Sequence, residues 1–232
     1  MKKFFLIFII LINVVLVSCI STKELIYIQP TEEATDSTLV VQELPTPYRI
    51  QIHDILNIRV KALDQESVRI FNPVGEQDLN AGGEERAYFD GFSVDIHGNI
   101  RVPILGYINV LGYTTEELEK LIEKRLLEEQ FKATANLFVS VKLTGLRYTV
   151  NGEVGSPGSR TLYQNKLNIF EAIANAGEIA TVGDRKDVMI IRQYPQGQKV
   201  HHLNLLEANV MQSPYYYIQP NDIIYVKPLK QK

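Results

Sequence analysis

Polar and apolar residues alternate in several short segments between residues 48 and 145, which is the pattern of β-strands with one buried face. In residues 56–62, apolar side chains occupy every second position and Asn, Arg or Lys stands between them. Shorter runs that also predict strands lie at residues 92–96, 99–103, 107–110 and 137–143. The tripeptide His97-Gly98-Asn99 is typical of a hairpin turn.

A helix is predicted from Thr114 to about Gln130, because Thr114 and Glu117 form a capping box. Its apolar stripe consists of Leu118, Leu121, Ile122 and Leu126. Residues 64–91 are polar and contain several glycines, so we expect a long loop there. Together these elements predict a small α+β domain over residues 48–145.

A second α+β unit is predicted over residues 146–228. Strand patterns lie at residues 147–150, 188–192, 199–203 and 223–227. Asn168 and Glu171 form a capping box for a short helix, and Gly177 provides its C-terminal stop. The segment 151–158 is rich in turn-forming residues. A sheet of four or five strands with one packed helix is similar to a β-grasp fold, and residues 229–232 form a tail.

The first 18 residues have the pattern of a secretory signal peptide. Lys2 and Lys3 precede an apolar run that only Asn13 interrupts. That run suits the apolar region of a signal peptide, and it is too short to span a bilayer of about 30 Å as a helix.

The signal ends in Leu16-Val17-Ser18-Cys19, which resembles the bacterial lipobox. In lipoproteins of this type, diacylglycerol is attached to the cysteine thiol and the signal peptidase cuts before that residue. Cys19 is the chain's single cysteine, which favours this interpretation over an incidental thiol after an ordinary secretory signal. Two acyl chains anchor a protein durably. Ile20 stands where an aspartate would favour retention in the inner membrane, so we expect the outer membrane.

Residues 19–47 are expected to form the lipidated N-terminus and a linker. Thr, Glu, Asp and Ser dominate residues 31–38, and two prolines follow. Such a composition cannot bury much apolar surface, so we expect an extended linker that lifts the body off the membrane. Tyr27 and Ile28 are weak strand candidates within it.

Composition and motifs exclude several classes of function. Without residues 1–18 the chain has 22 basic and 27 acidic residues and a formal charge of −5, whereas a general nucleic-acid binder needs a basic excess. One cysteine excludes a disulfide framework and a cysteine-rich metal site. The motifs of nucleotide-binding loops, zinc proteases and α/β-hydrolases are absent. We therefore expect no enzyme activity, cofactor or metal.

The candidate catalytic residues have structural explanations. Gly155-Ser156-Pro157-Gly158 has the wrong glycine spacing for a nucleophile elbow, so we expect a rigid turn. His53 and His97 lie in predicted turns. His201 and His202 are neighbours on a predicted strand and point to opposite faces, which is a poor geometry for joint metal binding.

Two further surfaces could face a sugar polymer. The predicted helix at 114–130 carries six glutamates among lysines and an arginine, which indicates a solvated face or a subunit contact instead of facing carboxylates. Tyr215-Tyr216-Tyr217 could form an aromatic platform. On a strand, however, Tyr216 would point away from its neighbours, so we expect core or interface packing. No residue is assigned to polymer contact.

Segments in the first unit resemble a polysaccharide-export domain. They are residues 48–58, residues 94–106 and the helix start at Gly112-Tyr113-Thr114. In the second unit, residues 150–158, the helix that ends at Ala176-Gly177 and residues 218–226 resemble a soluble-ligand-binding β-grasp (SLBB) domain. Signal, lipobox and both domains follow the order found in outer-membrane lipoproteins of capsule and exopolysaccharide export, the Wza type.

The chain departs from the family pattern at several positions. His53-Asp54 and Asn221-Asp222 stand where Gly-Asp is usual, and Glu178 replaces a second glycine. Because His and Asn can occupy turn conformations, we expect small backbone adjustments and an unchanged fold. A single SLBB domain and a proline-rich end without an amphipathic membrane helix resemble a short form of the family.

The resemblance implies a lipid-anchored protein of a Gram-negative outer membrane with its body in the periplasm. Several copies would form a homo-oligomeric ring through which a polysaccharide passes. It also implies an inner-membrane polysaccharide copolymerase or tyrosine-kinase-type partner, and a separate outer-membrane channel.

The alternative function is a lipid-tethered binding module whose β-grasp domain captures a soluble ligand. An enzyme that hydrolyses the polymer comes third. The resemblance over residues 48–145 favours export, since a receptor does not need that domain.

Overall fold

The computed structural model describes residues 21–29, 47–72, 88–131, 136–194 and 196–230. These residues form two compact units. The central unit comprises the described residues up to Arg147, starting at residue 47, and residues 161–165. The C-terminal unit comprises residues 148–160 and 166–230, and it also includes residues 21–29.

Three antiparallel strands form the sheet of the central unit. Their order is β2 (Phe92–Ser93), β1 (Ile55–Lys61) and β5 (Phe138–Leu143). A separate hairpin pairs β3 (Asn99–Val102) with β4 (Gly106–Asn109). Alternate residues of β1 and β5 enter the core, as the sequence pattern predicts.

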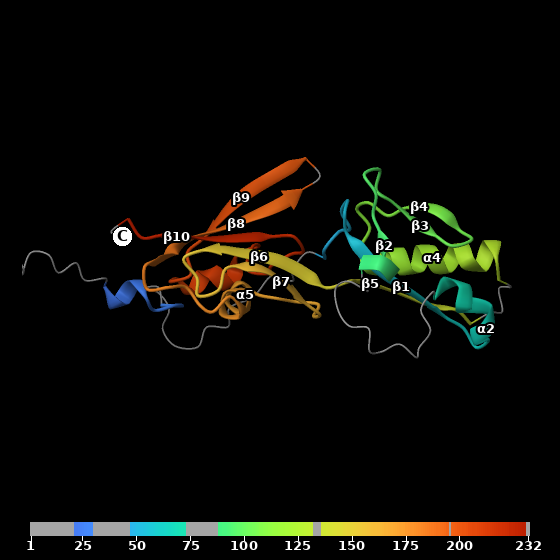
Figure 1. Ribbon diagram of the computed structural model, residues 1–232, viewed down its shortest axis with the longest axis horizontal. Helices are drawn as coiled ribbons and strands as arrows, with labels where there is room; N and C mark the ends of the chain where they lie inside the picture. The colour runs from blue at the N-terminus through green and yellow to red at the C-terminus, as the bar shows by residue number, and fades with distance from the viewer. Residues whose placement is uncertain (1–20, 30–46, 73–87, 132–135, 195, 231–232) are drawn as a thin grey trace, which may run out of the picture. The chain divides into compact units, whose positions relative to one another are not determined.

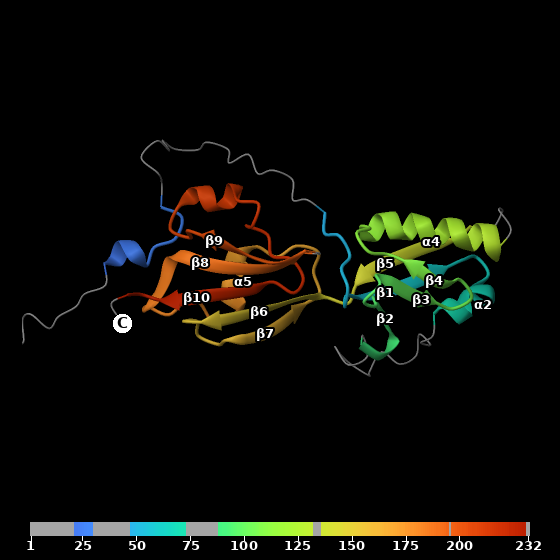
Figure 2. The same ribbon diagram turned by 90° about the horizontal axis from the view of Figure 1, so that it is seen from above.

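Helix α4 (Thr115–Glu129) packs against this sheet along β5 (Figure 2). Its N-cap, Thr114, forms the predicted capping box with Glu117. Leu118, Ile122 and Leu126 are fully buried in the core. The side chain of Glu119 accepts a hydrogen bond from the Val141 backbone at 2.8 Å, which ties the helix to the strand.

The predicted loop at residues 64–91 is wrong at its beginning and at residues 88–90, which are helical, while residues 73–87 lie outside the described residues. Its beginning forms the short helix α2 (Gln65–Val68) and the 3₁₀ turn η2 (Arg69–Phe71). Val68 and Phe71 are buried in the core of the unit. The apolar pattern missed them because two buried side chains in seven residues give no clear period.

The strand predicted at residues 92–96 ends at Ser93. The Asp95 carboxylate accepts hydrogen bonds from the backbone of His97 at 2.8 Å and of Asn99 at 2.9 Å, which turns the chain. A turn therefore lies at residues 95–98, but the strands beside it do not form a hairpin with each other. β2 pairs with β1, and β3 pairs with β4.

Five strands form the sheet of the C-terminal unit, with α5 (Ile169–Asn175) against one face (Figures 1 and 2). The strand order is β7 (Gly158–Leu162), β6 (Leu146–Gly152), β10 (Ile223–Pro228), β8 (Gly183–Tyr194) and β9 (Gly197–Leu203). β10 runs parallel to β6 and antiparallel to β8. A parallel pair beside a helix is the centre of a β-grasp sheet, so the predicted α+β fold is confirmed.

The core of this unit lies between the sheet and α5. Its fully buried side chains include Tyr148, Val150, Ile169, Ile173, Ile190 and Ile224. Asn168 caps α5 through the predicted capping box, and Gly177 ends the helix with a φ of 77°. β7 was not predicted, because its sequence, Gly-Ser-Arg-Thr-Leu, has no apolar alternation.

No helix within the described ranges is long and apolar enough to cross a membrane. Two shorter 3₁₀ turns complete the C-terminal unit. They are η1 (Thr22–Glu24) and η3 (Ala208–Gln212).

Candidate functional site

The predicted lipid-attachment residue, Cys19, and its lipobox neighbours Leu16, Val17 and Ser18 lie outside the described residues. Ser21, two positions after Cys19, is the first residue that the structure describes. The next residues, 21–29, are called the N-terminal segment below. Its position determines where a lipid on Cys19 would be attached to the folded protein.

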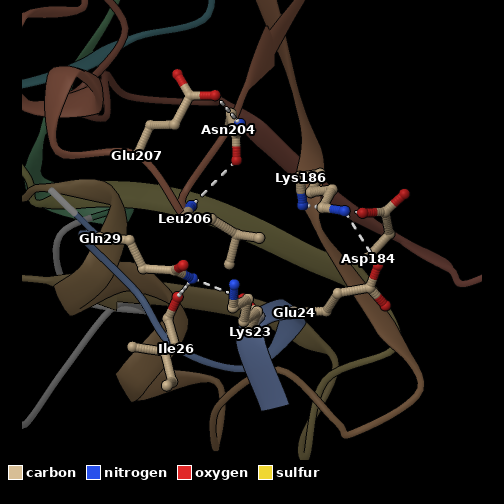
Figure 3. A network of polar contacts seen from close by, with 9 residues as sticks. All are labelled: Lys23, Glu24, Ile26, Gln29, Asp184, Lys186, Asn204, Leu206 and Glu207. Atoms are coloured by element: carbon tan, nitrogen blue, oxygen red, sulfur yellow. Dashed lines mark hydrogen bonds and ion pairs between the residues drawn. The ribbon is translucent and has the colours of Figure 1, made fainter. Parts of the chain in front are cut away.

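The N-terminal segment is a compact turn that its own side chains close (Figure 3). It starts with η1, and the Gln29 side-chain amide then donates to the backbone oxygens of Lys23 at 2.6 Å and Ile26 at 2.8 Å. Ile28 has a φ of 54°, a left-handed conformation that is unfavourable for a β-branched residue. Its surroundings must therefore hold this backbone in place.

Backbone hydrogen bonds join the end of this segment to the loop between β9 and η3. The N–H of Ile28 donates to the Leu205 oxygen at 3.2 Å, and the N–H of Gln29 donates to the Leu206 oxygen at 2.6 Å. The Ala208 N–H returns a bond to the Gln29 oxygen at 3.3 Å, and Gln29 forms a parallel bridge with Glu207.

The loop between β9 and η3 is held by hydrogen bonds within itself. The Asn204 side chain accepts from the Leu206 N–H at 3.1 Å and donates to Glu207 Oε1 at 2.6 Å (Figure 3). The carbonyls that receive the N-terminal segment are thus fixed by a side chain of the loop itself. Leu205 and Leu206 are both buried.

Tyr27 is the central side-chain contact of the segment. Its ring packs edge-on against Phe170 of α5 at 5.5 Å between centroids, and the Arg185 guanidinium lies 5.4 Å from the ring centre. Its hydroxyl donates to Glu178 Oε1. Burial, together with the nearby Glu178 carboxylate, raises the pKa of Tyr27 well above its ordinary value, so the hydroxyl stays protonated and donating at physiological pH.

Glu178 occupies a position where the sequence departs from the family pattern. Its φ is 71°, so the backbone there has the left-handed conformation that glycine adopts most easily. Its carboxylate also accepts from the Ile179 N–H at 3.0 Å. The departure therefore preserves the turn and adds an acceptor for Tyr27.

Arg185 is buried beneath this contact. It is 6% exposed, and its guanidinium donates to the Ile179 oxygen at 2.7 Å and the Ala180 oxygen at 3.2 Å. A further, more exposed contact lies at the other end of the segment, where Lys186 Nζ is 3.0 Å from Glu24 Oε1 (Figure 3). Such an ion pair is worth about 1 kcal/mol or less.

The extended linker predicted for residues 19–47 is therefore wrong for the N-terminal segment. Backbone hydrogen bonds and the buried side of Tyr27 hold residues 27–29 on the C-terminal unit. The weak strand pattern at Tyr27 and Ile28 coincides with the residues that dock on the C-terminal unit. Residues 30–46 lie outside the described residues.

The tyrosines at 215–217 do not alternate as they would on a strand, because residues 213–216 form a turn. Tyr216 and Tyr217 lie edge to face at 5.1 Å, so the expectation that Tyr216 points away from both neighbours is wrong. Tyr216 also contacts Phe170 at 6.2 Å. Tyr215 stacks on His201 at 3.6 Å with an interplanar angle of 15°. These rings pack against the protein, as expected.

A buried ion pair supports the aromatic turn. Arg192 donates from Nε to Asp222 Oδ1 at 3.0 Å and from a terminal nitrogen to Asp222 Oδ2 at 2.7 Å. The same guanidinium donates to the Tyr217 oxygen at 2.9 Å and lies 5.7 Å from the centre of the Tyr215 ring. Burial raises the pKa of Asp222, and Arg192 opposes that shift.

The remaining candidates occupy structural positions. His201 contacts Tyr194 and Tyr215, while His202 pairs with Asp187, so the two histidines do face different neighbours. His53 and His97 lie in turns. In the described parts of the chain, no three His, Cys, Asp or Glu residues gather closely enough to hold a metal ion.

The segment around Ser156 is also structural. The N–H groups of Gly155 and Ser156 donate to the oxygens of Glu178 and Ala176, at 2.9 and 2.7 Å. A Cβ on Gly155 would lie 2.3 Å from the Gly177 oxygen, so a side chain cannot be accommodated there without a shift. This close approach explains the glycine in the predicted rigid turn.

Comparisons with known proteins follow this division of the chain. Residues 42–144 match the family model described as polysaccharide biosynthesis/export protein, and residues 146–226 match the SLBB domain model.

Two curated relatives are EPS I polysaccharide export outer membrane proteins EpsA. The protein from Ralstonia nicotianae is 28% identical over 155 residues, covering 63% of this chain and 39% of the relative. The protein from Ralstonia solanacearum is 26% identical over 196 residues, covering 79% of this chain and 48% of the relative. The aligned region thus spans less than half the length of either relative.

Proposed function

Because this chain belongs to the polysaccharide biosynthesis/export protein family and carries an SLBB domain, we propose that it serves exopolysaccharide or capsule export at the outer membrane. In this proposal, a lipid on Cys19 anchors the protein, and its body lies in the periplasm. Several copies form a homo-oligomeric conduit, and the polysaccharide passes through it as cargo.

The observation that carries this proposal is the order of the segments along one chain. A signal sequence and lipobox come first, the export domain follows, and the SLBB domain comes last. The curated relatives are described as outer-membrane export proteins. The lipobox supports the same membrane from an independent part of the sequence.

Association between copies is supported by apolar side chains on the described surface of the central unit. Ile96, Ile104 and Tyr107 around the β3–β4 hairpin are 70, 51 and 67% exposed, and Phe138 on β5 is 61% exposed. A head-to-tail contact through such a surface forms a closed ring when the rotation from each copy to the next adds up to a full turn. Cross-linked ladders in cells would support this arrangement, and a monomer in concentrated detergent extracts would argue against it.

The proposal includes two kinds of partner. An inner-membrane polysaccharide copolymerase or tyrosine-kinase-type protein delivers the growing polymer. A separate outer-membrane channel completes the exit. Co-purification of either partner with cross-linked protein from membranes would test this part.

The decisive experiment measures surface and periplasmic polysaccharide in a deletion strain complemented with three versions of the chain. We expect the wild type and Ser18→Ala, which keeps a small residue in the lipobox, to restore surface polymer. We expect Cys19→Ala, which removes the lipidated thiol, to leave surface polymer low. Metabolic labelling with an alkyne fatty acid should mark the first two proteins and not the third.

Unchanged surface polymer after deletion, in a strain without a second such gene, would contradict the export function. A lipid-tethered module that binds a soluble ligand would then become the better explanation.

A further inference from the structure

We propose that the N-terminal segment is a latch that holds the SLBB unit at the membrane surface, through the contact between Tyr27 and Glu178. The lipid surface is therefore the partner of the C-terminal unit. This inference rests on the proposed lipidation of Cys19 and adds the position of the folded body.

The first step is the length of chain between the lipid and the latch. Tyr27 lies eight positions after Cys19, so eight residue-to-residue steps join them. At about 3.5 Å per fully extended residue, they span at most about 28 Å. A lipid on Cys19 therefore keeps the docked part of the C-terminal unit within about 28 Å of the bilayer.

The second step is that the latch is built from specific contacts at two places. Backbone hydrogen bonds hold Ile28 and Gln29 on the loop at 205–208. Tyr27 reaches Phe170 of α5 and Glu178 of the turn after it, and the guanidinium of Arg185 on β8 also faces its ring. Two separate attachments fix an orientation, whereas a single one leaves a hinge.

The third step is that two residues accept an unfavourable backbone conformation at this contact. Ile28 has a φ of 54° on the segment, and Glu178 has a φ of 71° on the receiving turn. Non-glycine residues stay in this region only when their surroundings hold them there. At Glu178 the side chain that imposes the strain is also the acceptor of the Tyr27 hydroxyl.

The pKa of Tyr27 gives the latch a defined pH range. Since the docked state raises the pKa of Tyr27 above its ordinary value, the undocked tyrosine ionises first as pH rises. The Tyr27 hydroxyl therefore contributes fully to docking below about pH 10, the ordinary tyrosine pKa. This contribution is lost at higher pH as the hydroxyl ionises. The Tyr27 hydroxyl therefore stays protonated and can donate to Glu178 throughout the physiological range.

The test uses full-length lipidated protein in vesicles of phosphatidylethanolamine and phosphatidylglycerol that carry an acceptor dye on their headgroups. The lipidated thiol of Cys19 is blocked, so a donor dye reacts only with an introduced cysteine, Ala174→Cys, on the exposed side of α5. Energy transfer then reports the distance from the C-terminal unit to the bilayer. Hydrogen exchange at Ile28 and Gln29 reports the docking itself.

Three variants separate docking from folding. Tyr27→Ala removes the ring and the hydroxyl, and the matched control, Ile26→Ala, changes a neighbouring side chain that is 56% exposed. Glu178→Gly removes the acceptor while giving the turn the residue that its φ favours, so loss of folding cannot explain its effect. We expect Tyr27→Ala and Glu178→Gly to speed exchange at Ile28 and Gln29 by about tenfold or more, as for loss of a charge-assisted hydrogen bond, and to lower energy transfer.

The latch proposal would be overturned by one combination of results in Tyr27→Ala. Fatty acid would still be attached and exchange at Ile28 and Gln29 would be faster, but energy transfer would stay at the wild-type value. Wild-type exchange rates in both Tyr27→Ala and Glu178→Gly would overturn it as well. Wild-type protein without fatty acid would instead overturn the proposed anchor and, with it, the membrane position. Fatty-acid labelling distinguishes this last failure from the others.

Discussion

The two units contain the same turn, at residues 51–54 in the central unit and at residues 219–222 in the C-terminal unit. In both, the N–H of the first glutamine donates to Oδ2 of the aspartate three residues later, at 2.9 and 2.8 Å. The aspartate N–H returns a bond to the glutamine oxygen, at 3.3 and 3.2 Å. The residue before the aspartate has a φ of 69° in one turn and 67° in the other.

The two aspartates differ in what else reaches them. In the central unit, Tyr48 donates its hydroxyl to Oδ2 of Asp54 at 2.8 Å, so both of these donors share one oxygen. In the C-terminal unit, Arg192 of β8 binds both oxygens of Asp222. Tyr48 is six residues away in sequence, whereas Arg192 is 30 away. The same local turn is therefore held by a nearby hydroxyl in one unit and by a distant guanidinium in the other.

This difference indicates that the side chain of Asp222 contributes more to the stability of its unit than the side chain of Asp54 does. Asp222 lies just before β10, and its partner lies on the neighbouring strand β8. The ion pair thus connects a turn to the centre of the sheet. The side-chain hydrogen bonds of Asp54 with Gln51 and Tyr48 involve residues no more than six positions away in sequence.

The largest expected effect is that of Asp222→Asn. An amide presents one acceptor and one donor, so its NH₂ group would face the donors of Arg192 and leave a buried cation without its second oxygen. Breaking a buried pair on one side costs about 3–5 kcal/mol. Hydrogen exchange of β8 and β10, compared between wild type and variant, measures this loss without interference from the central unit.

The control for that experiment removes both charges. Because paired apolar replacements of a buried ion pair are often nearly neutral, Arg192→Met with Asp222→Leu should be more stable than Asp222→Asn. Equal protection of β10 in Asp222→Asn and wild type would contradict the assigned role of the pair.

Asp54→Asn is expected to cost less, about 1 kcal/mol. Both donors reach the same oxygen, so the amide oxygen of asparagine can accept both hydrogen bonds and only the charge assistance is lost. Hydrogen exchange of β1 measures the effect, and Tyr48→Phe, which removes one donor, should give a similar loss. A cost as large as that of Asp222→Asn would mean that the two turns are held in the same way.

The sequence predicted the parts of the fold that rest on local signals. The capping boxes at Thr114 and Asn168 placed α4 and α5, and alternation placed β1 and β5, because caps and one-sided burial are visible within a few residues. β7 was missed because its pairing with β6 determines its conformation, and its own residues show no apolar alternation. Such tertiary effects have no local signal.

The candidate site shows the same limit. Glu178 was recognised as a departure from the family pattern, but its role depends on Tyr27, which is 151 residues away in sequence. Tyr27 stood in a segment that composition assigned to a linker. An aromatic residue close to the lipobox was the one signal that could have indicated docking.

A smaller effect is expected from the pH dependence of the two aspartates. Burial raises the pKa of both Asp54 and Asp222. Each carboxyl group therefore takes up its proton at a higher pH in the folded protein than in the unfolded chain, where the ordinary aspartate pKa is about 3.9. Arg192 opposes the shift of Asp222, so Arg192→Met should raise the pKa of Asp222 further and leave that of Asp54 unchanged. Carboxyl ¹³C NMR titration measures both, and a matching rise at Asp54 would contradict the comparison.

The smallest expected effects come from restoring glycine at the left-handed positions, His53 and Asn221. Asparagine tolerates this conformation better than histidine does, although glycine costs more conformational entropy on folding. We therefore expect His53→Gly to stabilise the central unit by at most about 1 kcal/mol and Asn221→Gly to change the C-terminal unit by only a few tenths. Paired exchange measurements on β1 and β10 give both values. A larger gain at Asn221 than at His53 would show that the ion pair of Asp222 strains its turn, whereas the expected order would show that both turns share one backbone preference and differ only in what holds the carboxylate.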